Sequence, residues 1–286
     1  MRNRQADINK AVQSHCVGFL AIDRSGRSEL VSHSAGSGTL VDFRGIRGIA
    51  TAAHVADVIK TLPEVGLMLF KPGLSYEAIT CKGSDLEVTK IGVEPYGIDG
   101  PDLAFVRLPH DIEDRIGASH AYFNSLVRAR AMVVGAERPP PELYFVTGIV
   151  SELSRPLGRK GNSAQTEHAA INGVGDIEGV ELGSDGFDRI DFRILHHTGF
   201  PAPTSYRGLS GGGLWMLGSG NDELSRTLIG IAYFETNKAR DGVRGIRCHG
   251  PLSLHETLYL AVLDRYAPEF AAEHRATEWP TETEGQ

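Results

Sequence analysis

The sequence predicts an all-β fold of antiparallel sheets, closed as barrels or packed as a sandwich. The 286 residues include 34 glycines, which divide the chain into short apolar runs. Polar turn residues, such as those at 24–26 and 98–100, separate the runs, as in turn-rich β proteins. The expected strands are Cys16–Ile22, Gly38–Asp42, Ile49–Ala52, Val65–Phe70, Leu86–Val93, Leu103–Leu108, Leu143–Val150, Ile190–Ile194, Gly213–Leu217, Leu228–Phe234 and Val243–Cys248.

The order of these runs predicts two β units that meet near residue 125. Residues 111–115 are polar, and Pro139-Pro140-Pro141 cannot donate the hydrogen bonds of a central strand. The stretch 153–186 is rich in Gly, Ser, Asn and charge, which is typical of a long surface loop. We therefore divide the chain into an N-terminal extension with a short helix (1–15), a first β unit (16–125), a second β unit (126–252), a C-terminal helix (253–267) and a polar tail (268–286).

The C-terminal helix has its own start and stop signals. Ser253 and Glu256 fit a capping box, with Ser253 as the N-cap residue. The helix is expected to end before Pro268. Its apolar face would consist of Leu254, Leu258, Ala261 and Val262.

Composition and charge argue against several classes of function. The net charge is −7 without a basic stripe, so no nucleic-acid partner is expected. The chain has no run of about 18 apolar residues, which argues against a transmembrane helix and a membrane partner. The polar start does not fit a secretory signal, and the odd, sparse set of Cys16, Cys81 and Cys248 fits reduced core residues. These features predict a cytoplasmic protein.

No cofactor or metal site is expected. His196 and His197 are adjacent in an apparent strand, so their side chains would point to opposite faces. The cysteines lack C-x-x-C spacing, no H-E-x-x-H motif exists, and no G-x-x-x-x-G-K-[ST] phosphate loop is present.

Three segments carry the residue types that nucleophilic acyl transfer requires: a hydroxyl, an imidazole, a carboxylate and backbone N–H groups. Thr51-Ala52-Ala53-His54 ends an apolar strand and leads into a short helix expected over 55–61, although a lone, partly buried histidine is the simpler explanation. Asp102 stands at the head of an apolar strand, where a turn-forming aspartate is common.

The third segment, Gly208-Leu209-Ser210-Gly211-Gly212-Gly213, is the strongest. Glycines allow a substrate backbone to approach and permit dihedrals that aim the N–H groups of Gly208 and Ser210 at one point, as an oxyanion hole. A flexible glycine-rich turn is one alternative. A nucleophile elbow of the α/β-hydrolase kind is another, but it requires a strand-to-helix turn, and an apolar strand follows Ser210.

Together the three segments resemble trypsin-like (chymotrypsin-fold) serine peptidases, over roughly residues 16–266, and look like a bacterial-type intracellular member. Gly36-Ser37-Gly38 followed by 51–54 is similar to the entry to the family's catalytic histidine. Residues 102–104 resemble its aspartate segment, 208–212 its nucleophile loop and 228–231 the strand beside its specificity pocket. The resemblance implies two antiparallel β-barrels and a C-terminal helix, with His54 and Asp102 from the first barrel and Ser210 from the second.

The sequence departs from this pattern at three positions. Leu209 stands where zymogens of the family have an aspartate that pairs with a new amino terminus, so no activation of that kind is expected. Gly213 replaces a common proline. Tyr233 stands where a small serine usually lies beside the catalytic aspartate, which alters how Asp102 is held.

The resemblance also implies a substrate pocket. Its base falls near Thr204 and Ser205, and its wall comprises Tyr233, Phe234 and Glu235. Because no aspartate lies at the base, a preference for Lys or Arg is not expected, and a neutral or small side chain is favoured.

The sequence thus predicts a serine endopeptidase that acts on protein or peptide substrates through Ser210, His54 and Asp102. A cytoplasmic peptidase without a zymogen lock would damage its own cell, so we expect narrow specificity or an activating protein partner. Two alternatives stay open: a non-catalytic protein-binding module on the same fold, and an esterase or amidase of small molecules.

Overall fold

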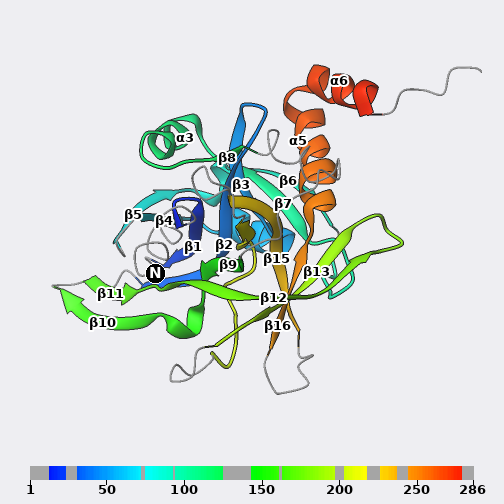
Figure 1. The fold of residues 1–286 in the computed structure, drawn as a ribbon. Coiled ribbons are helices and arrows are strands. Elements are labelled where there is room, and N and C mark those ends of the chain that lie inside the picture. Colours follow the sequence, from blue (N-terminus) through cyan, green and yellow to red (C-terminus); the bar gives the residue numbers. More distant parts are fainter. Residues whose placement is uncertain are drawn as a thin grey trace, which may run out of the picture.

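One large sheet and one closed barrel form the body of the molecule (Figure 1). The computed structural model describes residues 13–23, 31–71, 75–92, 94–124, 143–160, 163–196, 203–217, 226–236 and 244–278. The chain is mostly β, as expected, and each expected strand falls on an observed one. Most of the N-terminal extension, the boundary region at 125–142 and the tail at 281–286 lie outside the described residues.

The first half of the chain forms the sheet. Its strands run in the order β5-β4-β1-β2-β3-β7-β6 through antiparallel pairs, and β8 pairs in parallel with β2. Helix α2 (Ala53–Thr61) packs on this sheet through Val55, Ala56 and Ile59. The strands are β1 (Cys16–Asp23), β2 (Val31–Phe43), β3 (Ile46–Thr51), β4 (Val65–Lys71), β5 (Ser75–Cys81), β6 (Glu87–Ile91), β7 (Leu103–Arg107) and β8 (Phe123–Asn124).

This sheet is not closed within the described residues, so the expectation of two barrels is met only in the second half of the chain. Strands β5 and β6 are consecutive in sequence but do not pair. Between them a 3₁₀ helix, η1 (Gly83–Asp85), turns the chain against the end of α2, where the N–H of Gly83 donates to the carbonyl of Leu62 at 3.1 Å. Strands β5 and β6 lie at opposite ends of the strand order.

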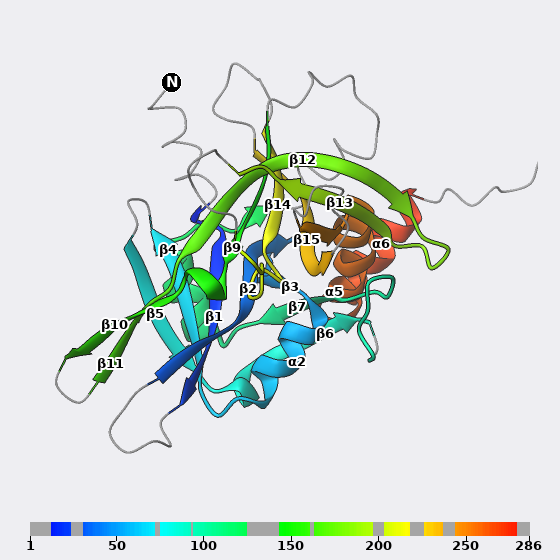
Figure 2. The same cartoon turned by 90° about the horizontal axis from the view of Figure 1, so that it is seen from below.

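The second half forms a closed six-stranded barrel in the order β12-β13-β16-β15-β14-β9. Its interior contains Val146, Phe192, Leu214, Ile229 and Ile246. Figure 2 shows β12 as a long, curved strand of the barrel with β13 beside it, and the hairpin β10–β11 projecting to one side. The strands are β9 (Leu143–Ile149), β10 (Arg155–Lys160), β11 (Ser163–Glu167), β12 (Ala170–Leu182), β13 (Asp188–Ile194), β14 (Gly213–Leu217), β15 (Arg226–Thr236) and β16 (Gly245–His249).

The interpretation of residues 153–186 as a surface loop is wrong, because β10, β11 and β12 lie within it. Gly173 and Gly175 of β12 mark close packing against β13, whereas Gly183 and Gly186 lie in the turn between β12 and β13. A Cβ at Gly175 would lie 1.9 Å from the carbonyl oxygen of Arg193 on β13, so only glycine permits this pairing. A short 3₁₀ helix, η2 (Ser151–Leu153), precedes β10.

A shared core joins the sheet, the barrel and the C-terminal helices. It includes Phe43 and Phe105 of the sheet, Trp215 and Leu228 of the barrel, and Tyr259. Helices α5 (Tyr259–Tyr266) and α6 (Pro268–Glu278) follow a π-helical segment, η3 (Ser253–Leu258), and lie beside the sheet (Figure 1). The two halves are therefore joined by apolar burial as well as by the chain.

The C-terminal segment differs from its expected form in two ways. The helical turns begin at Pro251, and Ser253 is not an N-cap. The carboxylate of Asp188 accepts from the N–H groups of Leu252 and Ser253 at 2.9 and 2.7 Å, so a barrel residue caps the helix and no capping box forms. Residues 268–278, expected as part of a polar tail, form α6, which buries Ala271 against the shared core.

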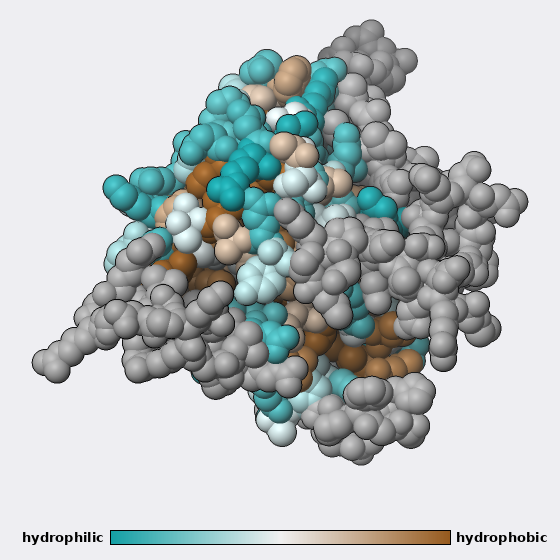
Figure 3. Space-filling model, turned by 90° about the vertical axis from the view of Figure 1, so that its left-hand side faces the viewer, coloured by the Kyte–Doolittle hydropathy of each residue, from teal (hydrophilic) through white to brown (hydrophobic). Residues whose placement is uncertain are grey.

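The polar stretch at 111–115 lies in α3 (His110–Gly117), whose buried Ile112 and Ile116 are one turn apart. Figure 3 shows the side of the molecule on which α3 and β5 lie in Figure 1; its described surface is mostly hydrophilic, with several separate apolar areas. In the part of the chain that the structure describes, no helix is long and apolar enough to cross a membrane.

Candidate active site

His54 and Asp102 form a close pair at the start of α2. Strand β3 ends at Thr51 and α2 begins at Ala53, which places His54 in the first turn of the helix. Asp102 directly precedes β7, which pairs with β3, and its side chain is buried. The Nδ1 atom of His54 lies 2.6 Å from Oδ2 of Asp102, and the backbone N–H of His54 donates to Oδ1 at 2.9 Å. The carboxylate thus fixes the ring and leaves Nε2 free for a substrate or nucleophile.

Ser210 lies on a glycine-rich turn that leads into β14. Gly208 and Gly211 have φ values of +96° and +91°, which L side chains rarely adopt. A Cβ at Gly211 would lie 1.9 Å from the carbonyl oxygen of Ser37, and one at Gly212 would lie 2.1 Å from that of Thr147. The glycines are therefore required by backbone conformation and close packing, so the turn is tightly constrained rather than flexible.

The turn leaves two backbone donors available. The N–H groups of Leu209, Gly211 and Gly212 donate to backbone carbonyls at 2.7–2.9 Å. Across 208–212, only Gly208 and Ser210 have N–H groups with no acceptor among the residues that the structure describes. These are the two donors that the sequence predicts for an oxyanion hole.

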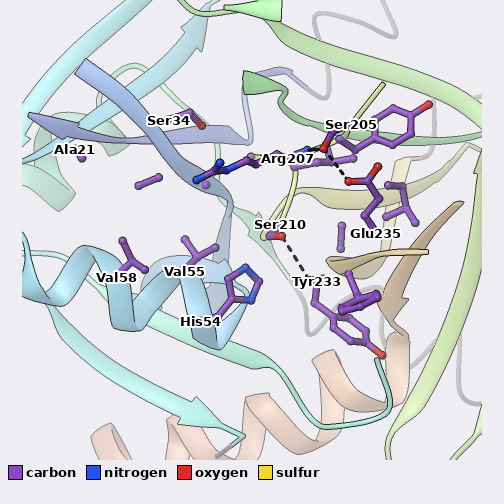
Figure 4. A pocket seen from close by; sticks show the side chains of 18 residues that line it. Ala21, Ser34, His54, Val55, Val58, Ser205, Arg207, Ser210, Tyr233 and Glu235 are labelled. Carbon is purple, nitrogen blue, oxygen red and sulfur yellow. Dashed lines mark hydrogen bonds between the residues drawn. The ribbon is translucent and has the colours of Figure 1, made fainter. Parts of the chain in front are cut away.

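His54 and Ser210 line one pocket of about 570 Å³. Figure 4 shows His54, Val55 and Val58 of α2 along one side of the pocket, and Ser205, Tyr233 and Glu235 on the barrel side. The hydroxyl of Ser210 donates to the carbonyl of Tyr233 at 3.4 Å, a long contact shown dashed in the figure. Asp102 lies behind His54 and does not line the pocket.

The expected substrate-pocket residues are brought together, with one exception. Ser205, Tyr233, Phe234 and Glu235 all line the pocket. Thr204 does not: its hydroxyl donates to Glu152 at 2.8 Å, and the same carboxylate accepts from the backbone N–H of Thr204 at 3.0 Å.

The carboxylate of Glu235 is compensated within the structure. One oxygen accepts from the hydroxyl of Ser205 at 2.9 Å, and the other pairs with the guanidinium of Arg244 at 2.8 Å. A charge that is already paired attracts a basic substrate side chain only weakly. The remaining lining includes apolar groups such as Ala232 and Ile246.

Ser37 joins the first sheet to the nucleophile turn, a role that the sequence did not identify. Its backbone N–H donates to the carbonyl of Ser210 at 2.8 Å, and its hydroxyl donates to that of Gly208 at 2.7 Å. The same hydroxyl accepts from the N–H of Ile149 at 2.8 Å. The sequence pattern marks Ser37 only as the centre of the Gly36-Ser37-Gly38 motif, because its hydrogen-bond partners lie more than a hundred residues away in the chain.

A second missed residue, His249 of β16, contacts Asp102. Its Nε2 atom accepts from the backbone N–H of Asp102 at 2.9 Å. The ring stacks on Tyr233, with centroids 4.3 Å apart and planes 19° apart. No local sequence signal marks this residue.

Tyr96 and Asp57 border the histidine. The ring of Tyr96 lies 6.2 Å from that of His54, and its hydroxyl hydrogen-bonds to the carboxylate of Asp57, which also pairs with Lys90. Burial raises the pKa of Asp57, but the hydrogen bonds from Tyr96 and Lys90 outweigh it, so the net pKa is lowered. The group is therefore ionised and paired at neutral pH.

Metal binding and thiol chemistry have little support among the described residues. No group of three or more His, Cys, Asp or Glu side chains in the described ranges could hold a metal ion. His196 bonds to Tyr206, whereas His197 lies outside the described residues. Burial raises the pKa of the Cys16 thiol to about 12 and that of Cys81 to about 11, so both stay protonated.

Two solved structures are similar to this chain at low sequence identity. No protein-family model and no curated protein matches the sequence. One similar solved structure is described as "Crystal structure of tobacco vein mottling virus protease"; it is 12% identical with a TM-score of 0.36, and the match covers 84% of this chain and 78% of that one. Another, described as "Aromatic interactions drive the coupled folding and binding of the intrinsically disordered Sesbania mosaic virus VPg protein", is 14% identical with a TM-score of 0.43, covering 86% and 90%. We draw nothing on function from likenesses this low.

Proposed function

We propose that the chain is a serine endopeptidase of the chymotrypsin-like kind, with Ser210 as nucleophile, His54 as general base and Asp102 as the orienting carboxylate. One observation carries the proposal: the two-point contact between His54 and Asp102 opens onto a pocket that also contains Ser210. The open first sheet would correspond to the first barrel of that fold and the closed barrel to the second.

The geometry supports the following sequence of steps. Ser210 Oγ attacks the carbonyl carbon of a peptide bond while His54 Nε2 accepts its proton. The N–H groups of Gly208 and Ser210 bind the oxyanion that forms. His54 then donates the proton to the leaving amine, and water hydrolyses the acyl-enzyme by the reverse use of the same groups.

One rearrangement precedes attack. In the free protein the Ser210 hydroxyl points to the Tyr233 carbonyl, at a distance typical of a weak bond. Rotation about χ1 of Ser210 turns the hydroxyl towards His54, and such bonds commonly form only in the substrate complex. This supports control by substrate or by an activating protein partner, in keeping with a cytoplasmic peptidase of narrow specificity.

The pocket favours a neutral or small substrate side chain over Lys or Arg, because Ser205 and Arg244 already compensate Glu235. Matched peptides with Ala or Lys before the scissile bond test this. We expect the Ala peptide to be cleaved faster, and Glu235→Gln to leave that order unchanged. Faster cleavage of the Lys peptide by the native protein, abolished in Glu235→Gln, would reverse the assignment.

The decisive experiment treats the purified protein with a fluorophosphonate probe and measures its intact mass. We expect a single label on the native protein and none on Ser210→Ala. Ser205→Ala is the matched control, because Ser205 lines the same pocket but has no role as nucleophile, and it should still label.

The outcomes separate the competing functions. A well-folded native protein that does not label, with or without candidate partner proteins, favours a non-catalytic binding module. Labelling together with hydrolysis of an activated ester, but of no protein substrate, favours an esterase or amidase. Broad digestion of unfolded casein would contradict narrow specificity while leaving the endopeptidase assignment intact.

A further inference from the structure

His249 joins the barrel to the segment that carries Asp102. It lies in β16, is fully buried, and accepts a hydrogen bond from the Asp102 backbone N–H through Nε2. An imidazole nitrogen that accepts must be unprotonated, so the ring proton resides on Nδ1. The contact therefore requires a neutral ring in one tautomer.

Two aromatic rings hold the His249 imidazole in place. Tyr233 stacks on one side at 4.3 Å, and Phe187 packs edge-on at 5.8 Å and 65°. Tyr233 also donates its hydroxyl to the carbonyl of Ile98 at 2.7 Å, while its own carbonyl accepts from Ser210. This pair, His249 and Tyr233, thus touches both the segment 98–102 and the nucleophile.

Two buried arginines of the barrel bind the same segment. Arg247 donates to the carbonyl of Ile98 at 3.3 Å and to the carboxylate of Asp99 at 2.9 Å. The guanidinium of Arg189 donates to the carbonyl of Asp99. The barrel therefore holds this main chain at Ile98 and Asp99 through the arginines and at Asp102 through His249.

The groups around His249 keep its imidazole neutral at neutral pH. Burial lowers the pKa of His249 to about 4; the nearby Arg189 lowers it too, while Asp102, Asp188 and Asp185 oppose the shift. The ring remains an acceptor at neutral pH.

We propose that His249, supported by Tyr233, is a positioning residue for the catalytic pair. By holding the Asp102 backbone from the barrel, it sets the carboxylate against His54 and at a fixed place relative to Ser210. The inference rests on the proposed function of Ser210, His54 and Asp102. It adds a residue that aligns His54 and Asp102, from the first sheet, with Ser210, from the barrel.

Two isosteric variants test the role. In His249→Gln the side-chain amide reaches about as far as Nε2 and can accept from Asp102, whereas in His249→Asn it ends near the position of Nδ1 and cannot. Both variants place one side-chain amide in the buried His249 site, so they should lower the free energy of unfolding by similar amounts. The readouts are the pH dependence of fluorophosphonate labelling and the downfield proton NMR signal of the His54 Nδ1 proton.

We expect His249→Asn to label about 10- to 100-fold more slowly at saturating probe, the range for a buried donor left without its acceptor. In this variant the midpoint of the labelling rate against pH should shift, and the NMR signal of the His54 Nδ1 proton should weaken. The probe concentration for half-saturation should stay unchanged. His249→Gln should retain most of the rate and the native pH midpoint. Tyr233→Phe keeps the stacked ring and removes the hydroxyl with its hydrogen bonds to Ile98 and Arg189. It should change the rate in the same direction by a few-fold.

The role is wrong if His249→Asn folds and keeps the native rate, pH midpoint and Nδ1 signal. Equal losses in the Gln and Asn variants with unchanged pH midpoints indicate a purely structural residue and also overturn it. If neither variant folds, an unchanged rate and Nδ1 signal in Tyr233→Phe overturns it. If the native protein itself does not label, the proposed function fails, and the Nδ1 signal still reports whether His249 positions the pair.

Discussion

The carboxylate of Asp102 serves the His54 side chain and the helix that carries it. Oδ2 lies 2.6 Å from Nδ1 of the ring, and Oδ1 accepts the His54 backbone N–H at 2.9 Å. The N-cap residue of α2, Ala52, provides no side-chain cap, so Asp102 supplies it from the neighbouring strand. A negative charge at this end of a helix is also favoured by the helix dipole. One carboxylate therefore fixes both the ring and the start of the helix.

Replacing Asp102 by Asn tests the orienting role. The fold should persist, because the amide is isosteric and its oxygen can still accept the His54 backbone N–H. The amide nitrogen donates where Oδ2 accepted, which favours the wrong imidazole tautomer. We expect the labelling rate to fall by about 10³- to 10⁴-fold. Stopped-flow labelling with intact-mass detection measures it, and a fall of less than tenfold would remove Asp102 from the proposed triad.

Two glycines with nearly the same backbone angle separate the cost of conformation from the cost of crowding. Gly45 has φ +90° with open space around its Cβ position, whereas Gly211 has φ +91° and would place a Cβ 1.9 Å from Ser37 O. Gly45→Ala should cost about 1–2 kcal/mol of unfolding free energy and leave labelling intact. Gly211→Ala should cost more and abolish labelling. Urea unfolding curves and probe labelling of both variants make the comparison; similar behaviour of the two would argue against a constrained nucleophile turn.

Removing the Ser37 hydroxyl should loosen the nucleophile turn. Ser37→Ala leaves the Gly208 carbonyl without its donor and the buried Ile149 N–H without its acceptor, at a cost of about 1–3 kcal/mol. Because Gly208 supplies one proposed oxyanion donor, labelling should slow by about tenfold or more. Ser84→Ala, an exposed serine in η1, is the control for removing a hydroxyl. A Ser37→Ala variant that loses stability but labels at the native rate would restrict Ser37 to a structural role.

Buried His255 makes the protein sensitive to acid. Burial lowers its pKa from 6.5 to about 4, partly opposed by its bond to the Leu228 carbonyl. Between these values the unfolded chain binds the proton and the folded chain does not. The free energy of unfolding therefore falls as pH drops from about 6.5 to 4. Above pH 6.5, His255 contributes no pH dependence to the free energy of unfolding.

The His255→Gln variant isolates that contribution. Its unfolding free energy should fall less steeply with acidification than that of the native protein, by up to about 1.4 kcal/mol per pH unit. Both proteins should have parallel curves above pH 6.5. Urea unfolding at half-unit intervals from pH 4 to 8 measures this, and parallel curves over the whole range would show that the folded protein protonates His255 normally.

Local patterns predicted α2 and most of the strands, because alternation and turn residues act over a few neighbours, but they did not predict β5 or β8. The interpretation of 153–186 was wrong, since Gly173 and Gly175 of β12 look like turn residues but allow close strand packing. The capping box at Ser253 was wrong because Asp188, far away in sequence, caps that helix instead. The two-barrel expectation was met only for the second half of the chain. The catalytic assignment of His54, Asp102 and Ser210 stays a prediction that the geometry supports.

The sequence by itself determined which candidate groups the chain carries: a histidine at a strand end, an aspartate before a strand, and a serine among glycines that a tight turn needs. Only the tertiary structure decided how these groups meet. The bonds of Asp102 to His54 and to His249 span 48 and 147 residues, and that of Ser37 to Gly208 spans 171. Such contacts depend on strand register and on the packing of two sheets. Local propensity does not encode them, because each partner is compatible with many other positions in the fold.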